Sequence, residues 1–302
     1  MPFDLGALLP TIGHLGNDVA DVREVARHAE QLGLDSLWAG DHLTMAGAPL
    51  LECMISLTAA AAVTSRVRIG CSVLLAGMRP LVWTAKQVAT MQYLSDNRLE
   101  LGVGVGAKWE DEWAAAGIPL NQRGRRADDL LRALPSLLSG QPTKLTGLPG
   151  EPEVTMRPPV AMPPLWIGGR AERAMRRTVS FGAGWLTTVS TPEEIRTQTR
   201  RLGELAAERG SPPPKIGTMI YANLTEGHSD GAEVAASSLA DAYGLPLEHT
   251  RKVAVGGSPE QAAAALATYR DAGVEQFVVA LTGTNWHQQY ELLARARTLL
   301  GA

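Results

Sequence analysis

The chain has 302 residues, of which 45% are hydrophobic and 20% are charged, and its formal net charge is −3. This composition is ordinary for a globular protein, and a chain of this length buries a substantial core without disulfides or metals. The slightly acidic balance argues against a nucleic-acid partner or an anionic membrane partner.

The chain carries two cysteines, Cys53 and Cys71. Neither lies in a CxxC or Cys/His spacing, so we expect free thiols and no metal site. The first residues, MPFDLGALLPTIG, do not resemble a signal peptide, because no basic segment precedes an apolar run. No apolar run reaches about 18 residues, so we expect no membrane helix. These features predict a cytoplasmic protein.

Short apolar runs of strand type recur along the chain, beginning with FDLGALL at 3–9 and DSLWA at 35–39. Because these runs are apolar on both faces, they indicate strands of a parallel sheet that is covered on both sides. The remaining predicted strands are 67–73, 98–105, 164–167, 184–188, 216–222 and 276–281.

Longer helical patterns separate the strands. Two of them begin with a strong start signal, because Thr191-Pro192 and Ser258-Pro259 each place a hydroxyl at the N-cap and a proline in the first turn. The predicted helices are 18–32, 51–64, 80–94, 123–139, 170–181, 192–209, 230–243, 258–272 and 286–300.

The alternation of strands and helices predicts the fold. Eight strand–helix units in one chain favour a closed α/β architecture, the (β/α)8 or TIM barrel, as a single domain over residues 1–302. The stretch 140–163, rich in proline, glycine and threonine, is predicted to be an insertion before the fifth strand. We expect it to lie over the barrel mouth as a lid.

The stretch GVGVGA at 102–107 matches the dinucleotide-binding pattern G-x-G-x-x-G/A. That pattern should open a helix, but here KWEDEW and then Gly117-Ile118-Pro119 follow, so a dinucleotide fold is disfavoured. Glycines at the C-terminal end of a strand instead allow a flat ring to approach the backbone closely.

Gly168-Gly169-Arg170 follows the strand PPLWI and precedes a predicted helix. Glycines at this position leave backbone N–H groups and the helix dipole free to bind an anion, and the arginine adds positive charge. A phosphate site is therefore favoured over a simple turn. Thr187 and Thr188 end the next strand, and their hydroxyls are candidates to close the same pocket.

The strand DSLWA turns polar after one glycine and presents Asp41 and His42 side by side. Catalytic residues of a TIM barrel come from the C-terminal ends of its strands, and His42 is the one histidine at such a predicted end. We therefore expect Asp41 and His42 to be catalytic.

Four segments in a fixed order carry a resemblance to a known family: DSLWAGDHL, TSRVRIGCSVLLAGMRPLVWTAKQVATMQYLSDNRLELGVGVG, RGRRADDLL and PPLWIGGRAERAMRRTVSFGAGWLTT. Together they closely resemble the bacterial luciferase-like flavin and deazaflavin oxidoreductases, over about residues 3–300. The Asp41-His42 pair resembles the branch that uses coenzyme F420, a 5-deazaflavin.

The resemblance implies a role for each matching residue. Asp41 and His42 match the pair at the reactive edge of the deazaflavin ring. Ser72-Val73 match a strand-end bulge with a non-prolyl cis peptide behind the ring. The strand end beside the pyrimidine side of the ring is matched by Gly104, Val105, Gly106 and Ala107. The phosphate loop is matched by Gly168, Gly169 and Arg170.

One position departs from the family. Where its sugar-phosphate dehydrogenases carry a glutamate that works as an acid, this chain has Ala107, which argues against that reaction. Glu110 and Asp111 lie nearby in the sequence. The resemblance favours an F420-dependent oxidoreductase. We expect the reduced deazaflavin to deliver hydride to a C=C or C=N bond, with His42 as proton donor or charge stabiliser and Asp41 orienting the imidazole or binding the ring edge. The opposite direction, oxidation of an alcohol with His42 as base, uses the same geometry and stays open.

Two other functions stay open from the sequence. One is an FMN-dependent monooxygenase on the same barrel, and the other is a deazaflavin-binding protein without catalytic activity. The expected partner is a small-molecule substrate, whose identity the sequence does not reveal. We also expect a homodimer, to which the apolar helix 51–64 is a candidate contributor.

Overall fold

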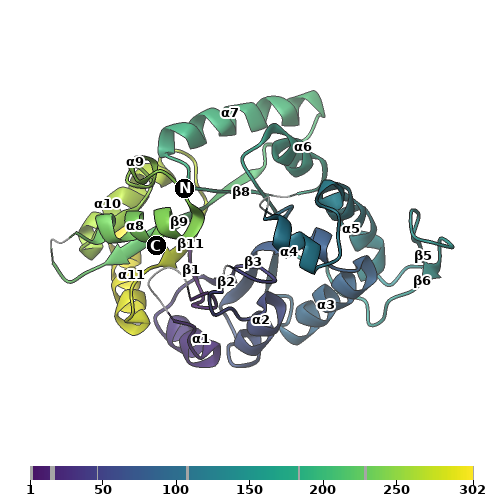
Figure 1. Ribbon diagram of the computed structural model, residues 1–302, viewed down its shortest axis with the longest axis horizontal. Coiled ribbons are helices and arrows are strands. Elements are labelled where there is room, and N and C mark those ends of the chain that lie inside the picture. Colours follow the sequence, from purple (N-terminus) through teal and green to yellow (C-terminus); the bar gives the residue numbers. More distant parts are fainter. Residues whose placement is uncertain are drawn as a thin grey trace.

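The computed structural model describes residues 3–13, 18–45, 47–106, 109–182, 184–227 and 230–301. Its centre is a parallel β-barrel ringed by helices (Figure 1). The barrel strands are β1 (Asp4–Leu8), β2 (Ser36–Ala39), β3 (Arg68–Leu75), β4 (Leu99–Gly104), β7 (Leu165–Gly168), β8 (Gly184–Thr188), β9 (Lys215–Leu224) and β11 (Gln276–Leu281).

The barrel closes because each of its strands has two parallel neighbours. The order is β9-β11-β1-β2-β3-β4-β7-β8, and β8 pairs with β9 to complete the ring. The predicted (β/α)8 barrel is therefore confirmed, and the eight predicted strands form it. All six residues of β4 and of β11 are buried, as expected for strands with barrel interior on one face and helices on the other.

The helices cover the outside of the barrel, and most lie within a few residues of their predicted bounds. The cap signals are confirmed, since Thr191 and Ser258 each form a capping box with the third helical residue. The long helices are α1 (Val22–Gln31), α2 (Cys53–Ala62), α3 (Leu81–Leu94), α5 (Arg123–Leu138), α6 (Glu172–Phe181), α7 (Pro192–Glu208), α8 (Gly231–Tyr243), α10 (Pro259–Arg270) and α11 (Trp286–Leu300).

The barrel interior is filled by large side chains from the strands. Trp38, Trp166, Leu186 and Val278 form one buried cluster there. The indole of Trp38 is fully buried and donates to the Ser36 hydroxyl over 2.8 Å, so this tryptophan belongs to the core and not to a ligand pocket. The filled interior leaves the C-terminal ends of the strands as the place for a site.

Several short elements were not predicted from the sequence. The most important is α4 (Glu110–Ala115), which follows β4 at the barrel mouth. The others are the strand pair β5 (Thr143–Lys144) and β6 (Glu153–Val154), the 3-10 turns Ala76–Met78 and Leu120–Gln122, α9 (Leu247–Thr250), and β10 (Val255–Gly257), which pairs with β9 outside the barrel.

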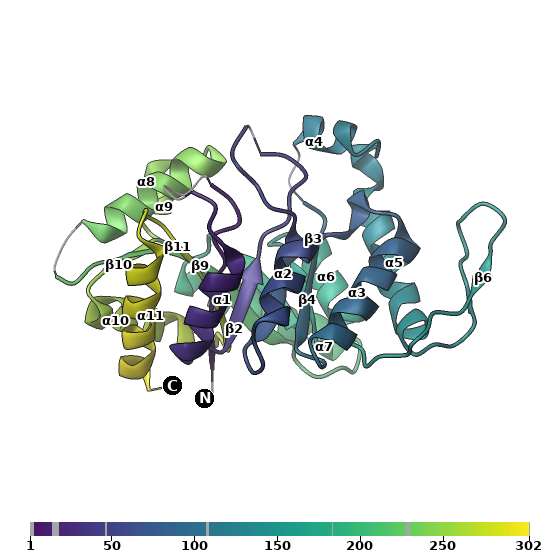
Figure 2. The same ribbon diagram turned by 90° about the horizontal axis from the view of Figure 1, so that it is seen from below.

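We expect the insertion 140–163 to lie over the barrel mouth, but in the structure it does not. Its hairpin β5–β6 projects from the side of the barrel beyond α3 and α5 (Figures 1 and 2). Lys86 of α3 donates to the Arg157 carbonyl over 2.7 Å, and Gln92 to the Ala161 carbonyl over 2.9 Å. The reason is topological, because a segment that links a helix to the next strand begins and ends at the N-terminal face of the barrel.

None of the described helices is long and apolar enough to cross a membrane.

Candidate functional site

A cavity of about 230 Å³ lies at the C-terminal ends of β3, β4, β7 and β8. The residues that these four strands contribute span positions 72 to 188 of the sequence. They meet here because adjacent parallel strands end at one edge. The lining contains most of the predicted cofactor residues together with two that the sequence did not suggest. It consists of Ser72, Val73, Gly104, Val105, Gly106, Gly168, Gly169, Leu186, Thr187, Thr188 and Met219.

The backbone of β3 changes course inside this cavity. The Ser72–Val73 peptide bond is cis, and the register between β3 and β4 shifts between Cys71 and Leu74. Both features were implied by the family resemblance. They turn the Val73 side chain toward the neighbouring strand ends, where it fills the space that larger residues would need.

The glycines of the cavity are required by this close approach. A Cβ at Gly104 would lie 2.3 Å from Cγ2 of Val73, and one at Gly168 would lie 2.9 Å from its Cγ1. Real carbon atoms do not approach so closely, so any side chain there would displace Val73. The result is a shallow, smooth floor on which a flat ring can lie against backbone atoms.

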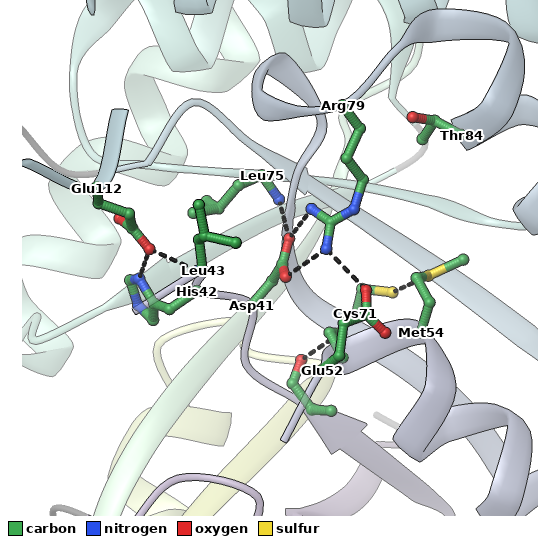
Figure 3. A network of polar contacts seen from close by, with 12 residues as sticks. Asp41, His42, Leu43, Glu52, Met54, Cys71, Leu75, Arg79, Thr84 and Glu112 are labelled. Carbon is green, nitrogen blue, oxygen red and sulfur yellow. Dashed lines mark hydrogen bonds and ion pairs between the residues drawn. The ribbon is translucent and has the colours of Figure 1, made fainter. Parts of the chain in front are cut away.

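Asp41 is held in an ion pair beneath the mouth. Its carboxylate accepts two hydrogen bonds from the Arg79 guanidinium, over 2.6 and 2.8 Å, and a third from the Leu75 backbone N–H over 2.7 Å. Arg79 also contacts Glu52 over 2.9 Å. Figure 3 shows the Asp41 carboxylate directed to Arg79 and Leu75, so it anchors the turn that follows the cis peptide.

His42 lies beside a different acid. Its Nδ1 atom is 3.1 Å from Oε1 of Glu112 in α4, and the same oxygen accepts the Leu43 backbone N–H over 2.7 Å (Figure 3). The Glu112 side chain is 2% exposed and that of His42 is 15% exposed, so the pair is largely shielded from water. The second oxygen of Glu112, Oε2, is buried and has no hydrogen-bond partner among the described residues.

Aromatic rings extend from His42 across the mouth. The indole of Trp109 lies 4.8 Å from the imidazole between ring centroids, and Tyr243 of α8 stacks on Trp109 at 6.4 Å. Burial raises the pKa of the Tyr243 hydroxyl, with the neighbouring Tyr221 adding to the effect. Trp109, Glu112 and Tyr243 line a second cavity of about 540 Å³, whose walls combine these aromatic rings with three acids.

His42 itself lines a third cavity, of about 510 Å³, with Met78, Arg79 and Ala116 among its walls. The imidazole and the glycine-lined cavity are therefore neighbouring parts of the mouth rather than two walls of one pocket.

The start of α6 supplies the candidate anion site. Gly168 and Gly169 line the cavity, and the helix N-cap residue, Ala171, makes no side-chain capping bond. The acid in the first turn, Glu172, already offsets part of the positive helix end, and the Gly169 backbone N–H donates to the Leu186 carbonyl over 3.3 Å, so an anion here would meet the remaining N–H groups of the first turn. The exposed Arg170 donates from Nη1 to the Val189 carbonyl over 2.7 Å, which ties the loop after β7 to the loop after β8.

Residues 2–243 match the sequence profile of the family described as luciferase-like monooxygenase. The chain belongs to this family. The match covers the first seven barrel strands and the whole of the cavity described above.

A curated enzyme resembles part of this luciferase-like protein. The F420-dependent glucose-6-phosphate dehydrogenase of Beutenbergia cavernae is 31% identical over 182 residues, which are 57% of this chain and 53% of that enzyme. The chain spans 50% to 61% of the length of the curated relatives it matches.

Two solved structures superpose on the entire luciferase-like chain, and each alignment covers 100% of both chains. One is an F420-dependent secondary alcohol dehydrogenase in complex with an F420-acetone adduct, with a TM-score of 0.84 and 16% identity. The other is the monooxygenase RslO1 from Streptomyces bottropensis, with a TM-score of 0.81 and 21% identity. At these identities the likeness shows the fold.

The sequence did not single out Glu112 of the luciferase-like chain. It offered Glu110 and Asp111 as candidate acids, and both are exposed, whereas Glu112 is buried. One feature of the sequence could have pointed to Glu112. It directly precedes Trp113, a large apolar residue that anchors the short helix. Ala107, a predicted cofactor residue, lies outside the described residues.

Proposed function

We propose that this chain is a coenzyme F420-dependent oxidoreductase that reduces a C=C or C=N bond of a small organic substrate. The observation that carries this proposal is the cavity with the glycine floor, whose lining reaches from the ends of β3 and β4 to the start of α6. The F420-dependent relatives named above support the same cofactor.

The residues present fit a deazaflavin. Gly104 and Gly168 keep the floor free of side chains, Val73 supports the ring from behind, and the uncapped start of α6 is available for the phosphate. When bound, the deazaflavin supplies hydride chemistry without ready oxygen activation. At about 230 Å³ the cavity is below the roughly 300–1,000 Å³ of whole-ligand pockets, so we assign to it the ring and not the entire cofactor.

In this proposal His42 manages the proton of a substrate that extends from the glycine-lined cavity to the neighbouring cavity that His42 lines. A carboxylate only accepts hydrogen bonds, so Glu112 fixes the Nδ1–H tautomer of a neutral imidazole and leaves Nε2 for the substrate. In its protonated form the ring donates from Nε2 to the substrate, while Glu112 keeps it oriented and balances its charge. Asp41 has an indirect role, since its carboxylate positions the turn beneath the cavity through Arg79.

The test is a titration of the purified protein with F420 and, separately, with FMN. We expect saturable binding of F420, and turnover of an activated alkene or imine panel with the reduced cofactor. His42→Ala should lower kcat by about 10²–10⁴-fold, with little change in the Kd of F420. Unchanged turnover in this variant would refute the role of His42, and binding of FMN alone would refute the cofactor assignment.

A second candidate function is an FMN-dependent monooxygenase. The family description and the likeness to RslO1 favour it, and the same glycine floor accommodates either ring. Oxygen uptake separates the two proposals, because reduced FMN bound at the site would consume oxygen whereas the reduced deazaflavin would not.

We also propose that the protein forms a homodimer through α2 and α3. Large apolar side chains are exposed there, with Ile55 and Trp83 each 70% exposed and Tyr93 66% exposed. Such a concentration of apolar surface is typical of an interface. Trp83→Asp should shift the molecular mass in light scattering from dimer to monomer, and a monomeric wild-type protein would exclude the proposal.

A further inference from the structure

Outside the barrel mouth, imidazoles and carboxylates gather between the first and the last long helix. His28 of α1 and His287 and Glu291 of α11 each offer one ligand atom, and these atoms lie within 4.8 Å of one another. Glu24 of α1 joins them, with Oε1 3.3 Å from Nε2 of His287. Figure 2 shows α1 and α11 side by side on the outer surface.

The helical spacing explains this arrangement. Glu24 and His28 are four residues apart in α1, and His287 and Glu291 are four residues apart in α11, so each pair shares one face of its helix. Each helix presents its histidine to the glutamate of the other. The two imidazole centroids are consequently only 4.5 Å apart.

The two imidazoles pack against a neighbouring indole. The indole of Trp286 stacks on His287 with centroids 3.8 Å apart, and it meets His28 edge-on at 5.8 Å. The Nε2 atom of His28 is buried and has no hydrogen-bond partner among the described residues, while Oε1 of Glu291 lies 4.0 Å from it. In the tautomer that carries its proton on Nδ1, this nitrogen is available as a metal ligand.

We propose that His28, His287 and Glu291 form a zinc site, with Glu24 as the neighbouring carboxylate. Two imidazoles and carboxylate oxygen are ligands that Zn²⁺ favours, and two carboxylates with two neutral rings balance its charge. Tetrahedral ligands at about 2.0–2.1 Å from the metal lie roughly 3.3 Å apart. The 4.8 Å group closes to this spacing by side-chain rotation, because His287 and Glu291 are 49% and 57% exposed.

The position of the site gives zinc a structural effect. Strands β1 and β11 pair with each other where the two ends of the chain close the barrel, and α1 and α11 cover that seam. An ion held by both helices links the chain ends. Because it binds the folded state, the melting temperature should rise with zinc concentration.

The experiment is calorimetric titration of the chelator-treated protein with Zn²⁺ at 25 °C. We expect one site of micromolar or tighter affinity, no heat with Mg²⁺, and at least tenfold weaker binding in both His287→Gln and Glu291→Gln. His249→Gln, which removes a histidine elsewhere on the surface, is the matched control and should bind as the wild type does.

Zinc X-ray absorption should show nitrogen and oxygen ligands without sulfur, which distinguishes this site from Cys53 and Cys71. The inference is overturned if the wild type binds no zinc, if both variants bind it unchanged, or if sulfur ligates the ion. Circular dichroism identifies any variant that fails to fold. In that case Glu24→Gln, which removes the neighbouring carboxylate, replaces the unfolded variant. The site is refuted if the zinc affinity is unchanged both in Glu24→Gln and in the remaining folded variant.

Discussion

The Oε1 atom of Glu112 lies 3.1 Å from Nδ1 of His42, a residue 70 positions earlier in the chain. It also accepts the backbone N–H of Leu43, so one buried oxygen fixes both the ring and the backbone of the loop after β2. The pair joins α4 to that loop at the mouth of the barrel. Any role of His42 in proton transfer therefore depends on Glu112.

We expect Glu112→Gln to lower kcat by roughly 10–100-fold while the KM for the cofactor stays close to that of the wild type. The reason is that the amide keeps the shape of the side chain but loses the charge that orients the imidazole. Steady-state kinetics with the reduced cofactor measures this. Asp111→Asn, an exposed acid of the same helix, is the control and should be silent. Equal losses in both variants would point to a general effect on α4 and against positioning of His42.

The Asp41–Arg79 pair should be essential for stability. Arg79→Met removes two of the hydrogen bonds to the Asp41 carboxylate, whose side chain is 1% exposed, and leaves a buried charge. Breaking such a pair costs about 3–5 kcal/mol of unfolding free energy, measurable by urea denaturation. The double variant Asp41→Asn/Arg79→Met should lose less than the sum of the single losses, and strict additivity would contradict the pairing.

The glycine floor gives a test of cofactor binding. Gly104→Ala puts a Cβ 2.3 Å from Cγ2 of Val73, so Val73 must move into the space proposed for the ring and the affinity for F420 should fall at least tenfold. Gly203→Ala in α7 meets nothing within 4 Å. This control should keep the affinity and raise stability by about 0.5–1 kcal/mol. Fluorescence titration of both variants decides the matter.

Glu30 should make the stability depend on acidity. Partial burial opposes its ionisation, but the N–H groups of Arg66, Val67 and Ser65 donate to the carboxylate and lower its pKa to about 2. Since the unfolded value is near 4.3, the stabilisation is complete above about pH 5 and is lost as the pH falls toward 2.

We expect Glu30→Gln to cost about 1 kcal/mol at pH 7, a figure reduced for exposure to solvent. The difference from the wild type should shrink progressively between pH 5 and about pH 2. Urea denaturation across this range provides the measurement. A difference that stays constant with pH would mean that the Glu30 pKa is the same in the folded and unfolded states, and would contradict the lowered pKa.

Much of the fold was predictable because its signals are local. Strands such as β4 and β11 are apolar on both faces, as a parallel sheet covered on both sides requires. The helix caps at Thr191 and Ser258 each depend on four consecutive residues. That Gly104 and Gly168 would share one edge was also predictable, since the ends of neighbouring parallel strands must meet there, whereas Ser72 and Val73 were expected from the family resemblance alone.

The tertiary structure decided which side chains face each other. Asp41 and His42 are adjacent in sequence, yet one is directed to Arg79 and the other to Glu112, which are 38 and 70 residues away. Likewise, His28 meets His287 only because the barrel closes and brings α1 against α11. Local sequence patterns encode the period of a helix or strand, whereas contacts between distant residues arise from closure of the barrel and the direction each side chain takes within it.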